Sequence, residues 1–244
     1  ASSTRLDIRY HNFDNISLKE FLKNLCKIKI KKFPNNKISY KRKRINLSTK
    51  TNLERKITVK SLFTILNNFI TANNMVIADV GDTLFGGLDL FIYKGTEFIS
   101  PAFYLSMGFA IPACLGAQLA NSNIRPIVLV GDGAFQMTGN ELSTIAKENL
   151  NPIIILLNND GYRTERSMLD GPFNNLARWN YSKIIEVIGK GKSCVVNTEK
   201  QFSTALLNAN RNLNEFNLIE VKVDKWDSSH ALERLTKVFG KKLK

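Results

Sequence analysis

The sequences PIVLVGDG (residues 126–133) and PIIILLNNDG (residues 152–161) are two apolar runs that each end in small and polar residues. Uninterrupted apolar runs of this length are typical of parallel strands that are buried on both faces. A helical pattern lies between the two runs, so we expect both strands to point the same way. The carboxyl ends of such strands meet at one edge of the sheet, which is where ligands bind in open α/β folds.

The chain after residue 57 alternates strands with helices and predicts an α/β domain with a doubly wound parallel sheet. Thr58 is expected to cap the first helix, whose apolar face runs from Val59 to Phe69. Further strands are predicted at residues 75–80, 127–130, 153–157, 193–196 and 218–223. Further helices are predicted at residues 104–120, 135–148, near 184, 202–210 and 231–239, with a glycine-rich loop after Gly81-Asp82.

The residues before this domain divide into two parts. Residues 1–33 contain a predicted strand at residues 6–10 and a helix from Ser17, and they are too few to hold a core of their own. Residues 34–56 are interpreted as a basic linker, which leaves residues 57–244 as the main domain. The chain does not begin with methionine, and we expect a cut or processed N-terminus.

The positive charge of the chain is concentrated in one segment. The 244 residues carry 35 lysines and arginines against 21 acids, a net charge of +14, and residues 27–44 hold nine basic residues and no acid. This composition is typical of a solvated linker. The alternative functions of this segment are to neutralise phosphates, to lie on an anionic membrane, or to act as a localisation signal. Its aromatic residues, Phe33 and Tyr40, are too few for a base-stacking platform, so nucleic acid is not the expected partner.

The overall composition is that of a folded protein, because a hydrophobic content of 43% can bury a core. Three widely spaced cysteines, without a CxxC pair or a nearby histidine, indicate a reducing compartment and neither a disulfide framework nor a zinc site. The longest apolar runs are far shorter than the roughly 20 residues of a membrane helix, and the start of the chain lacks an apolar signal region. We therefore expect a soluble, cytoplasmic protein with no membrane partner.

The residues that follow the two apolar runs form the candidate site. Asp132 and Asn159 are expected to face each other at the edge of the sheet, and their oxygen atoms suit Mg²⁺. Gly131 and Gly133 let the backbone approach a phosphate, and the helix that begins near Ala134 turns its amides toward it. The sequence therefore predicts a magnesium-bound diphosphate. An ordinary turn is the alternative for either motif alone, but two such motifs after neighbouring strands favour a ligand site.

Gly131-Asp132-Gly133 followed by Asn158-Asn159 resembles the diphosphate motif of thiamine-diphosphate-dependent enzymes. The sequence LNNDGYRTERSMLDGPFNNLARWNY, residues 157–181, is similar to the pyruvate and indolepyruvate decarboxylases of that family. The likeness extends from about Thr58 to the C-terminus, and residues 1–33 resemble the end of the family's middle domain. The resemblance implies the thiamine-diphosphate-binding fold for residues 57–244.

The resemblance assigns roles to individual residues. Asp132 and Asn159 would bind Mg²⁺ through their side chains, and Gly161 through its carbonyl. Glu165 stands where the decarboxylases have a catalytic glutamate, which makes it a candidate proton donor or relay, partly desolvated beside the cofactor. The candidates for cofactor binding are Gly81, Asp82, Thr83, Ser106, Met107 (a support for the bent cofactor), Gly131, Asp132, Gly133, Ala134, Asn159, Gly161 and Tyr162.

One pair of residues departs from the family pattern. Arg163-Thr164 stands where relatives usually have threonine and then a small aliphatic residue before the glutamate. The resemblance therefore leaves the polarity of the pocket and the choice of substrate open.

By this resemblance, the parent enzyme uses thiamine diphosphate and Mg²⁺ to decarboxylate a 2-oxo acid, such as pyruvate or indolepyruvate, to an aldehyde without oxidation. The family has an N-terminal pyrimidine-binding domain that completes the active site, and this domain does not precede residue 1. We therefore expect the chain to be inactive alone, either as a fragment or as a separate subunit that needs a partner. The resemblance implies a homodimer or homotetramer for the parent enzyme. The alternatives are a carboligase like acetolactate synthase and a catalytically incomplete cofactor-binding remnant.

Overall fold

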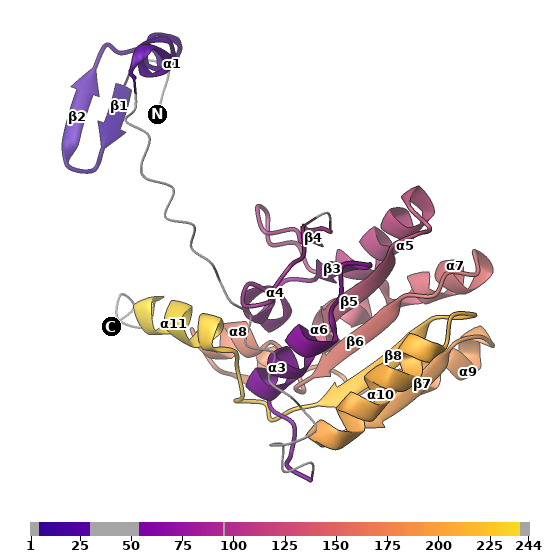
Figure 1. Ribbon diagram of the computed structural model, residues 1–244. Helices are drawn as coiled ribbons and strands as arrows, with labels where there is room; N and C mark the ends of the chain where they lie inside the picture. The colour runs from indigo at the N-terminus through magenta and orange to yellow at the C-terminus, as the bar shows by residue number, and fades with distance from the viewer. Residues whose placement is uncertain (1–4, 30–53, 95, 240–244) are drawn as a thin grey trace. The chain divides into compact units, whose positions relative to one another are not determined.

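The computed structural model describes residues 5–29, 54–94 and 96–239 (Figure 1). The chain divides into two units, Ala1–Lys43 and Arg44–Lys244, and each is described by itself. Most of the predicted basic linker lies outside the described residues, so its boundaries stay a prediction. In the described ranges, no helix combines the length and the apolar character that crossing a membrane requires.

The first unit is a β-hairpin followed by a helix. Strands β1 (Arg5–Ile8) and β2 (His11–Asp14) pair in antiparallel fashion, and helix α1 (Leu18–Lys27) follows. The Ser17 side chain caps α1 by accepting a hydrogen bond from the backbone N–H of Glu20, as predicted. The strand predicted at residues 6–10 is present as β1 but ends at Ile8, because the chain turns at Arg9 and Tyr10. The polar sequence HNFD then forms a second strand that was not predicted.

Six parallel strands form the sheet of the second unit, in the order β4-β3-β5-β6-β8-β7. Gly131 lies opposite Leu157 in the register of β5 and β6, so the segments after these two strands begin side by side. The predicted doubly wound parallel sheet is confirmed. The strands are β3 (Asn74–Ala78), β4 (Phe98–Ile99), β5 (Arg125–Gly131), β6 (Ile153–Asn158), β7 (Lys192–Val196) and β8 (Asn217–Lys222).

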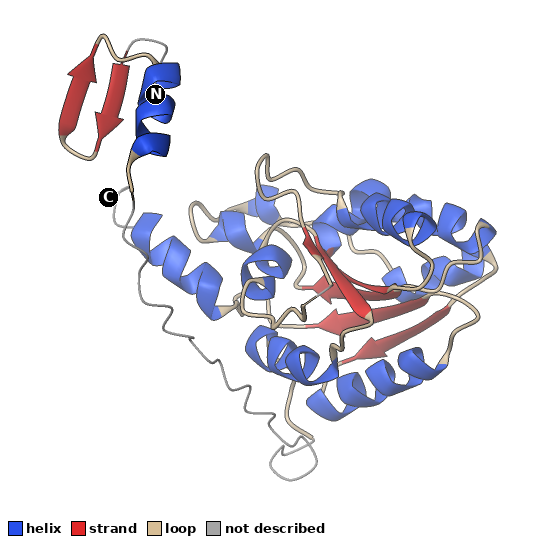
Figure 2. Ribbon diagram, turned by 45° about the horizontal axis from the view of Figure 1, so that its top comes forward, coloured by secondary structure: helices blue, strands red, loops and turns tan. Residues whose placement is uncertain are grey.

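Helices cover both faces of this sheet (Figure 2). Helices α3 (Val59–Phe69) and α10 (Glu199–Arg211) pack on one face, and α5 (Ala110–Ala120), α6 (Asp132–Thr138), α7 (Leu142–Lys147) and α9 (Ile184–Ile188) pack on the other. Side chains alternate along each strand, so Ile127 and Leu129 join one core and Val128 and Val130 join the other. This burial on both faces explains the uninterrupted apolar runs.

The predicted start of helix α3 is confirmed. The Thr58 hydroxyl accepts a hydrogen bond from the Ser61 backbone N–H at 3.1 Å, and the Ser61 hydroxyl accepts one from the Thr58 backbone N–H at 3.0 Å. This reciprocal capping box fixes the first turn.

Two predicted helices differ from their predicted bounds. The helix predicted at residues 104–120 begins only at Ala110, because the chain before it turns at Leu105 and Gly108, both with positive φ. The helix predicted at residues 135–148 begins earlier, at Asp132, and is divided by a 3₁₀ turn, η1 (Gly139–Glu141), into α6 and α7. A Cβ at Gly139 would lie 2.6 Å from the Phe135 ring, so glycine permits this close packing.

A short helix, α4 (Asp82–Gly87), occupies the predicted glycine-rich loop. Its glycines serve packing, since a Cβ at Gly86 would lie 2.0 Å from the Phe63 ring on α3. The glycine content of this segment suggested a loop. In the structure, the glycines instead allow α4 to pack closely against α3. The remaining elements are α8 (Arg163–Arg166), η2 (Pro172–Asn174), η3 (Tyr181–Lys183) and α11 (His230–Phe239).

Candidate functional site

A cavity of about 600 Å³ lies at the carboxyl ends of β3, β5 and β6. This is the edge at which the apolar runs predicted a ligand site. The sequence-predicted residues that line it are Gly81, Asp82, Thr83, Met107, Gly131, Asp132, Gly133, Ala134, Asn159, Gly161, Tyr162 and Glu165. Ser106, although predicted with them, is exposed and does not line the cavity.

Asp132 lies at the centre of the site, directly after β5, and is only 2% exposed. Its Oδ1 accepts a hydrogen bond from the Gly133 N–H at 2.8 Å, and its Oδ2 accepts from Asn159 at 3.2 Å and Gly161 at 3.0 Å. Burial raises the pKa of Asp132 to about 6, although these three hydrogen bonds oppose the shift. The carboxylate thus ties the segments after β5 and β6 together, as the register of the strands predicted.

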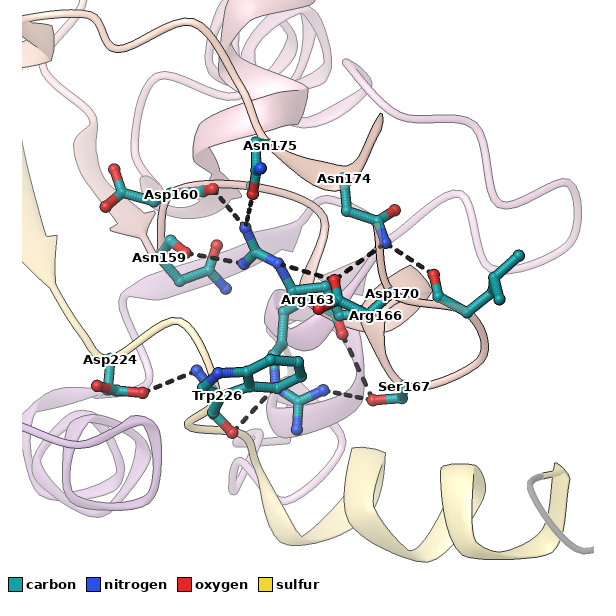
Figure 3. A network of polar contacts seen from close by, with 12 residues as sticks. Asn159, Asp160, Arg163, Arg166, Ser167, Asp170, Asn174, Asn175, Asp224 and Trp226 are labelled. Atoms are coloured by element: carbon teal, nitrogen blue, oxygen red, sulfur yellow. Dashed lines mark hydrogen bonds and ion pairs between the residues drawn. The ribbon is translucent and has the colours of Figure 1, made fainter. Parts of the chain in front are cut away.

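The backbone at Asn159 and Asp160, next to Asp132 in the site, is held by Arg166, which is 5% exposed (Figure 3). Its Nη1 donates to the Asn159 carbonyl at 3.2 Å, and its Nη2 donates to the Asp160 carbonyl at 2.6 Å and to Asn175 Oδ1 at 3.0 Å. A planar guanidinium can satisfy several carbonyls at fixed angles, so Arg166 sets the course of the backbone here. Arg166 was not predicted from the sequence, because a charge beside Glu165 carries no signal of burial.

Gly161 is required by its conformation and by its surroundings. Its φ is +143°, and a Cβ there would lie 2.0 Å from the Asn174 carbonyl oxygen. Gly131 is different, because no atom lies within 4 Å of the position of its Cβ, and yet it lines the cavity. Space beside Gly131 is what a bound phosphate would need.

The segment after β3 contributes a second buried acid, Asp79, which the sequence analysis also missed. Asp79 is fully buried and accepts hydrogen bonds from the N–H groups of Gly108, at 3.1 Å, and Ala110, at 2.8 Å. It thereby fixes the turn that carries Met107 at the mouth of the cavity. Asp79 follows a buried strand, as Asp132 does, so the same sequence signal could have found it.

Asp82 and Thr83 line the cavity from α4 but differ in their partners. The Thr83 hydroxyl donates to the Asp79 carbonyl at 2.8 Å, which satisfies it within the chain. Asp82 accepts a hydrogen bond from the Ser229 N–H, with its Oδ2 at 2.9 Å. Burial raises the pKa of Asp82 to about 6, while hydrogen bonds from Ser229 oppose the shift.

Two parts of the cavity can now be defined. The floor consists of Asp132, Asn159 and Gly161, all buried. The rim consists of Leu105, Met107, Glu165 and Met168, all exposed. Glu165 lies on α8, is exposed and lines the cavity, and its partial desolvation beside a bound cofactor stays a prediction.

The oxygen atoms of the floor fit a magnesium ion. A carboxylate has about four acceptor positions, and three of those of Asp132 are occupied, which leaves one for a cation. The Asn159 side chain has no hydrogen-bond partner among the residues that the structure describes. The described ranges contain no cluster of three or more His, Cys, Asp or Glu side chains that could hold a metal ion. A single carboxylate with amide and carbonyl oxygens suits Mg²⁺ bound together with phosphate and water.

Comparison with known proteins gives consistent matches. Residues 79–221 match the family described as thiamine pyrophosphate enzyme, C-terminal TPP binding domain. An alpha-keto-acid decarboxylase of Mycobacterium leprae is 35% identical over 167 residues, which are 67% of this chain and 29% of that protein. An alpha-keto-acid decarboxylase of Mycolicibacterium paratuberculosis is 33% identical over 67% of this chain and 30% of its own length. The chain therefore spans about 30% of the length of these curated relatives.

A solved structure shares the fold. It is a thiamine diphosphate-dependent 4-hydroxybenzoylformate decarboxylase from Rhodococcus jostii, with a TM-score of 0.64 and 24% sequence identity. The match covers 73% of this chain and 34% of that one. The six-stranded sheet with helices on both faces is therefore the fold of a thiamine-diphosphate-binding domain.

Proposed function

Because this chain belongs to the family of thiamine pyrophosphate enzymes through its C-terminal TPP-binding domain, we propose that it supplies the diphosphate and Mg²⁺ half of a 2-oxo acid decarboxylase. The observation that carries the proposal is the buried floor, where Asp132, Asn159 and Gly161 meet beside an open space at Gly131. The names of the relatives, alpha-keto-acid decarboxylases, support the reaction class.

In this proposal the floor residues bind the cofactor through its metal ion. The Asp132 carboxylate, the Asn159 side-chain oxygen and the Gly161 carbonyl would hold Mg²⁺. The cation would compensate the burial of the Asp132 charge, which raises its pKa in the chain alone. Gly131 would leave room for the phosphates, and Asp82 and Thr83 would border them from α4. Met107 would support the rest of the cofactor from the rim.

Thiamine diphosphate, when bound, supplies a nucleophile and an electron sink for the carbanion left by loss of CO₂. Glu165 would donate or relay the proton that completes formation of the aldehyde, since its carboxyl group lines the same cavity. The exposure of Glu165 in the chain means that a further surface must exclude water from the rim. We propose that an N-terminal pyrimidine-binding domain, in the same chain or a partner subunit, provides that surface.

The exposed rim supports this part of the proposal. Leu105 is 50% exposed, Met107 40% and Met168 46%. Apolar side chains gathered at the mouth of a cavity are typical of a surface that another domain covers. A homodimer or homotetramer of the parent enzyme would place such a domain there.

The experiment that tests the proposed function is a product assay on the full-length protein with thiamine diphosphate, Mg²⁺ and a panel of 2-oxo acids. Release of CO₂ together with the corresponding aldehyde is the expected result. A hydroxy-oxo acid product would identify a carboligase instead. The absence of both products from a protein that binds the cofactor would indicate a catalytically incomplete binding domain.

A further inference from the structure

Arg163 lines the cavity from the first position of α8, two residues before Glu165. An arginine in a cavity for an anionic substrate has two possible roles, either binding the substrate carboxylate or holding the protein together. The hydrogen bonds of its guanidinium distinguish these roles.

All three nitrogens of the Arg163 guanidinium contact the protein. Figure 3 shows the contacts with Trp226 and Ser167. Nε donates to the carbonyls of Trp226, at 3.1 Å, and Asp227, at 3.2 Å. Nη1 donates to the Ser167 hydroxyl, and Nη2 donates to the Ser228 hydroxyl at 3.4 Å. The guanidinium carbon also lies 5.8 Å from the centroid of the Trp226 ring, within the range of a cation–π contact. Binding a substrate would therefore require the loss of several contacts.

The segment that Arg163 contacts, residues 226–229, is itself fixed to the domain. The Asp227 Oδ2 accepts a hydrogen bond from the Val59 N–H at 2.7 Å, at the start of α3. The Ser229 N–H donates to Asp82 on α4, which lines the cavity. Residues 226–229 thus form a support held from two helices, and α11, which follows, contributes Leu235 and Thr236 to the cavity.

Helix α8 has little stability of its own. It has four residues and no side-chain cap at its N-terminus, so it depends on tertiary contacts. Arg166 attaches it to the floor, and Arg163 attaches it to residues 226–229. Glu165 lies between these two arginines and is exposed, so these two attachments define its position.

We propose that Arg163 is a positioning residue, which fixes α8 against residues 226–229 and thereby places Glu165 at the cavity. This inference rests on the proposed function for the role of Glu165, but not for the attachment itself. Arginine suits the position because its planar fork reaches two carbonyls and a hydroxyl while it stacks on an indole ring. Lysine would keep the charge but lose the fork and most of the stacking.

The test compares full-length protein carrying Arg163→Lys or Arg163→Gln with the unchanged protein. Arg211→Gln is the matched control, since Arg211 is an exposed arginine at the end of α10. Amide hydrogen exchange is followed by mass spectrometry, alongside titration of thiamine diphosphate with Mg²⁺ and steady-state kinetics. Both Arg163 variants are expected to exchange faster at residues 163–169, with no change at residues 126–133.

In the kinetics, kcat is expected to fall about 10-fold or more in the Arg163 variants, because a displacement of about 1 Å is costly for catalysis. The KM for the 2-oxo acid and the Kd for the cofactor are expected to change less than twofold. Unchanged exchange at residues 163–169 would overturn the inference. A raised KM with unchanged kcat would also overturn it, because that result identifies Arg163 as a substrate-binding residue. Faster exchange in a protein without any decarboxylase activity would support the attachment and refute the proposed function alone.

Discussion

The floor and the rim of the cavity are built in different ways. On the floor, the Asp132 carboxylate accepts three backbone hydrogen bonds, and Arg166 holds the neighbouring carbonyls from below. On the rim, Met107 and Glu165 project from a turn and from a helix of four residues, and both are exposed. The floor is therefore defined by contacts inside the chain, whereas the rim side chains are exposed.

This difference separates the two tasks of the proposed enzyme. Binding of the Mg²⁺ ion would rest on the floor, which lies at the ends of β5 and β6. Proton transfer by Glu165 needs the rim to be positioned and shielded from water. We therefore expect floor variants to change stability and cofactor affinity, and rim variants to change turnover.

The largest effect is expected on the floor for Gly161→Ala. The new Cβ would lie 2.0 Å from the Asn174 carbonyl oxygen, at a φ of +143°. Strain and overpacking together are expected to lower the free energy of unfolding by about 4 kcal/mol, as measured by urea denaturation.

The matched control is Gly131→Ala, at a site with φ of −79° and no atom within 4 Å of the new Cβ. It is expected to leave the free energy of unfolding within about 0.5 kcal/mol of the unchanged protein. Equal stability losses in the two variants would show that the floor is not organised as described.

On the rim, Glu165→Gln is expected to reduce kcat of the full-length enzyme about 100-fold, because removal of a general acid or relay has an effect of this size. The Kd for thiamine diphosphate is expected to stay the same, since the hydrogen bonds to Asp132 on the floor come from backbone N–H groups and not from Glu165. Full turnover in this variant would remove Glu165 from the mechanism.

Asp82 predicts a pH dependence of stability. Its pKa is raised by burial to about 6 in the folded chain, above the ordinary value of 3.8, so the folded state binds this proton more tightly than the unfolded state. Between about pH 4 and pH 6, this group therefore reduces stability as the pH rises, by an amount on the order of 2–3 kcal/mol.

Replacement by Asp82→Asn removes that contribution. Chemical denaturation at pH 4.5 and pH 7 is expected to show a smaller loss of stability toward pH 7 in the variant than in the unchanged protein. The pKa of the buried Asp132 stays raised in both proteins, so the difference between them reports on Asp82 alone. If the change in stability between pH 4.5 and pH 7 were the same in both proteins, the raised pKa of Asp82 would be contradicted.

The smallest effect is expected for Met107→Ala on the rim, because this side chain is 40% exposed. The free energy of unfolding is expected to change by about 0.5 kcal/mol or less. The fully buried Leu129 in the core is the comparison, and Leu129→Ala is expected to cost about 2–5 kcal/mol. A loss at Met107 as large as that at Leu129 would mean that the rim is packed within the chain.

The sequence predicted the floor better than the rim. Buried parallel strands appear as continuous apolar runs, and polar residues directly after them mark the edge of the sheet. Asp132 and Asn159 were therefore found from the sequence. Asp79 follows the same rule, but the polar residues Gly81-Asp82 just after it drew the prediction instead.

The rim could not be predicted from local patterns. The turn at Leu105 and Gly108 is held by hydrogen bonds to Asp79, about 30 residues earlier, and no periodicity reports such a contact. Arg163 and Arg166 lie on one short helix and appear alike in the sequence, but one contacts residues 226–228 and the other is buried under the floor. Tertiary contacts distinguish them, and these are not encoded in spacing.

The most direct measurement is a calorimetric titration of the protein with thiamine diphosphate, with and without Mg²⁺, for the unchanged sequence, Asp132→Asn and Glu165→Gln. Magnesium-dependent binding is expected, which Asp132→Asn weakens by about 100-fold or more and Glu165→Gln leaves unchanged. Binding that is independent of Mg²⁺, or equally strong in the Asp132→Asn variant, would show that the floor of this cavity does not hold the cofactor through its metal ion.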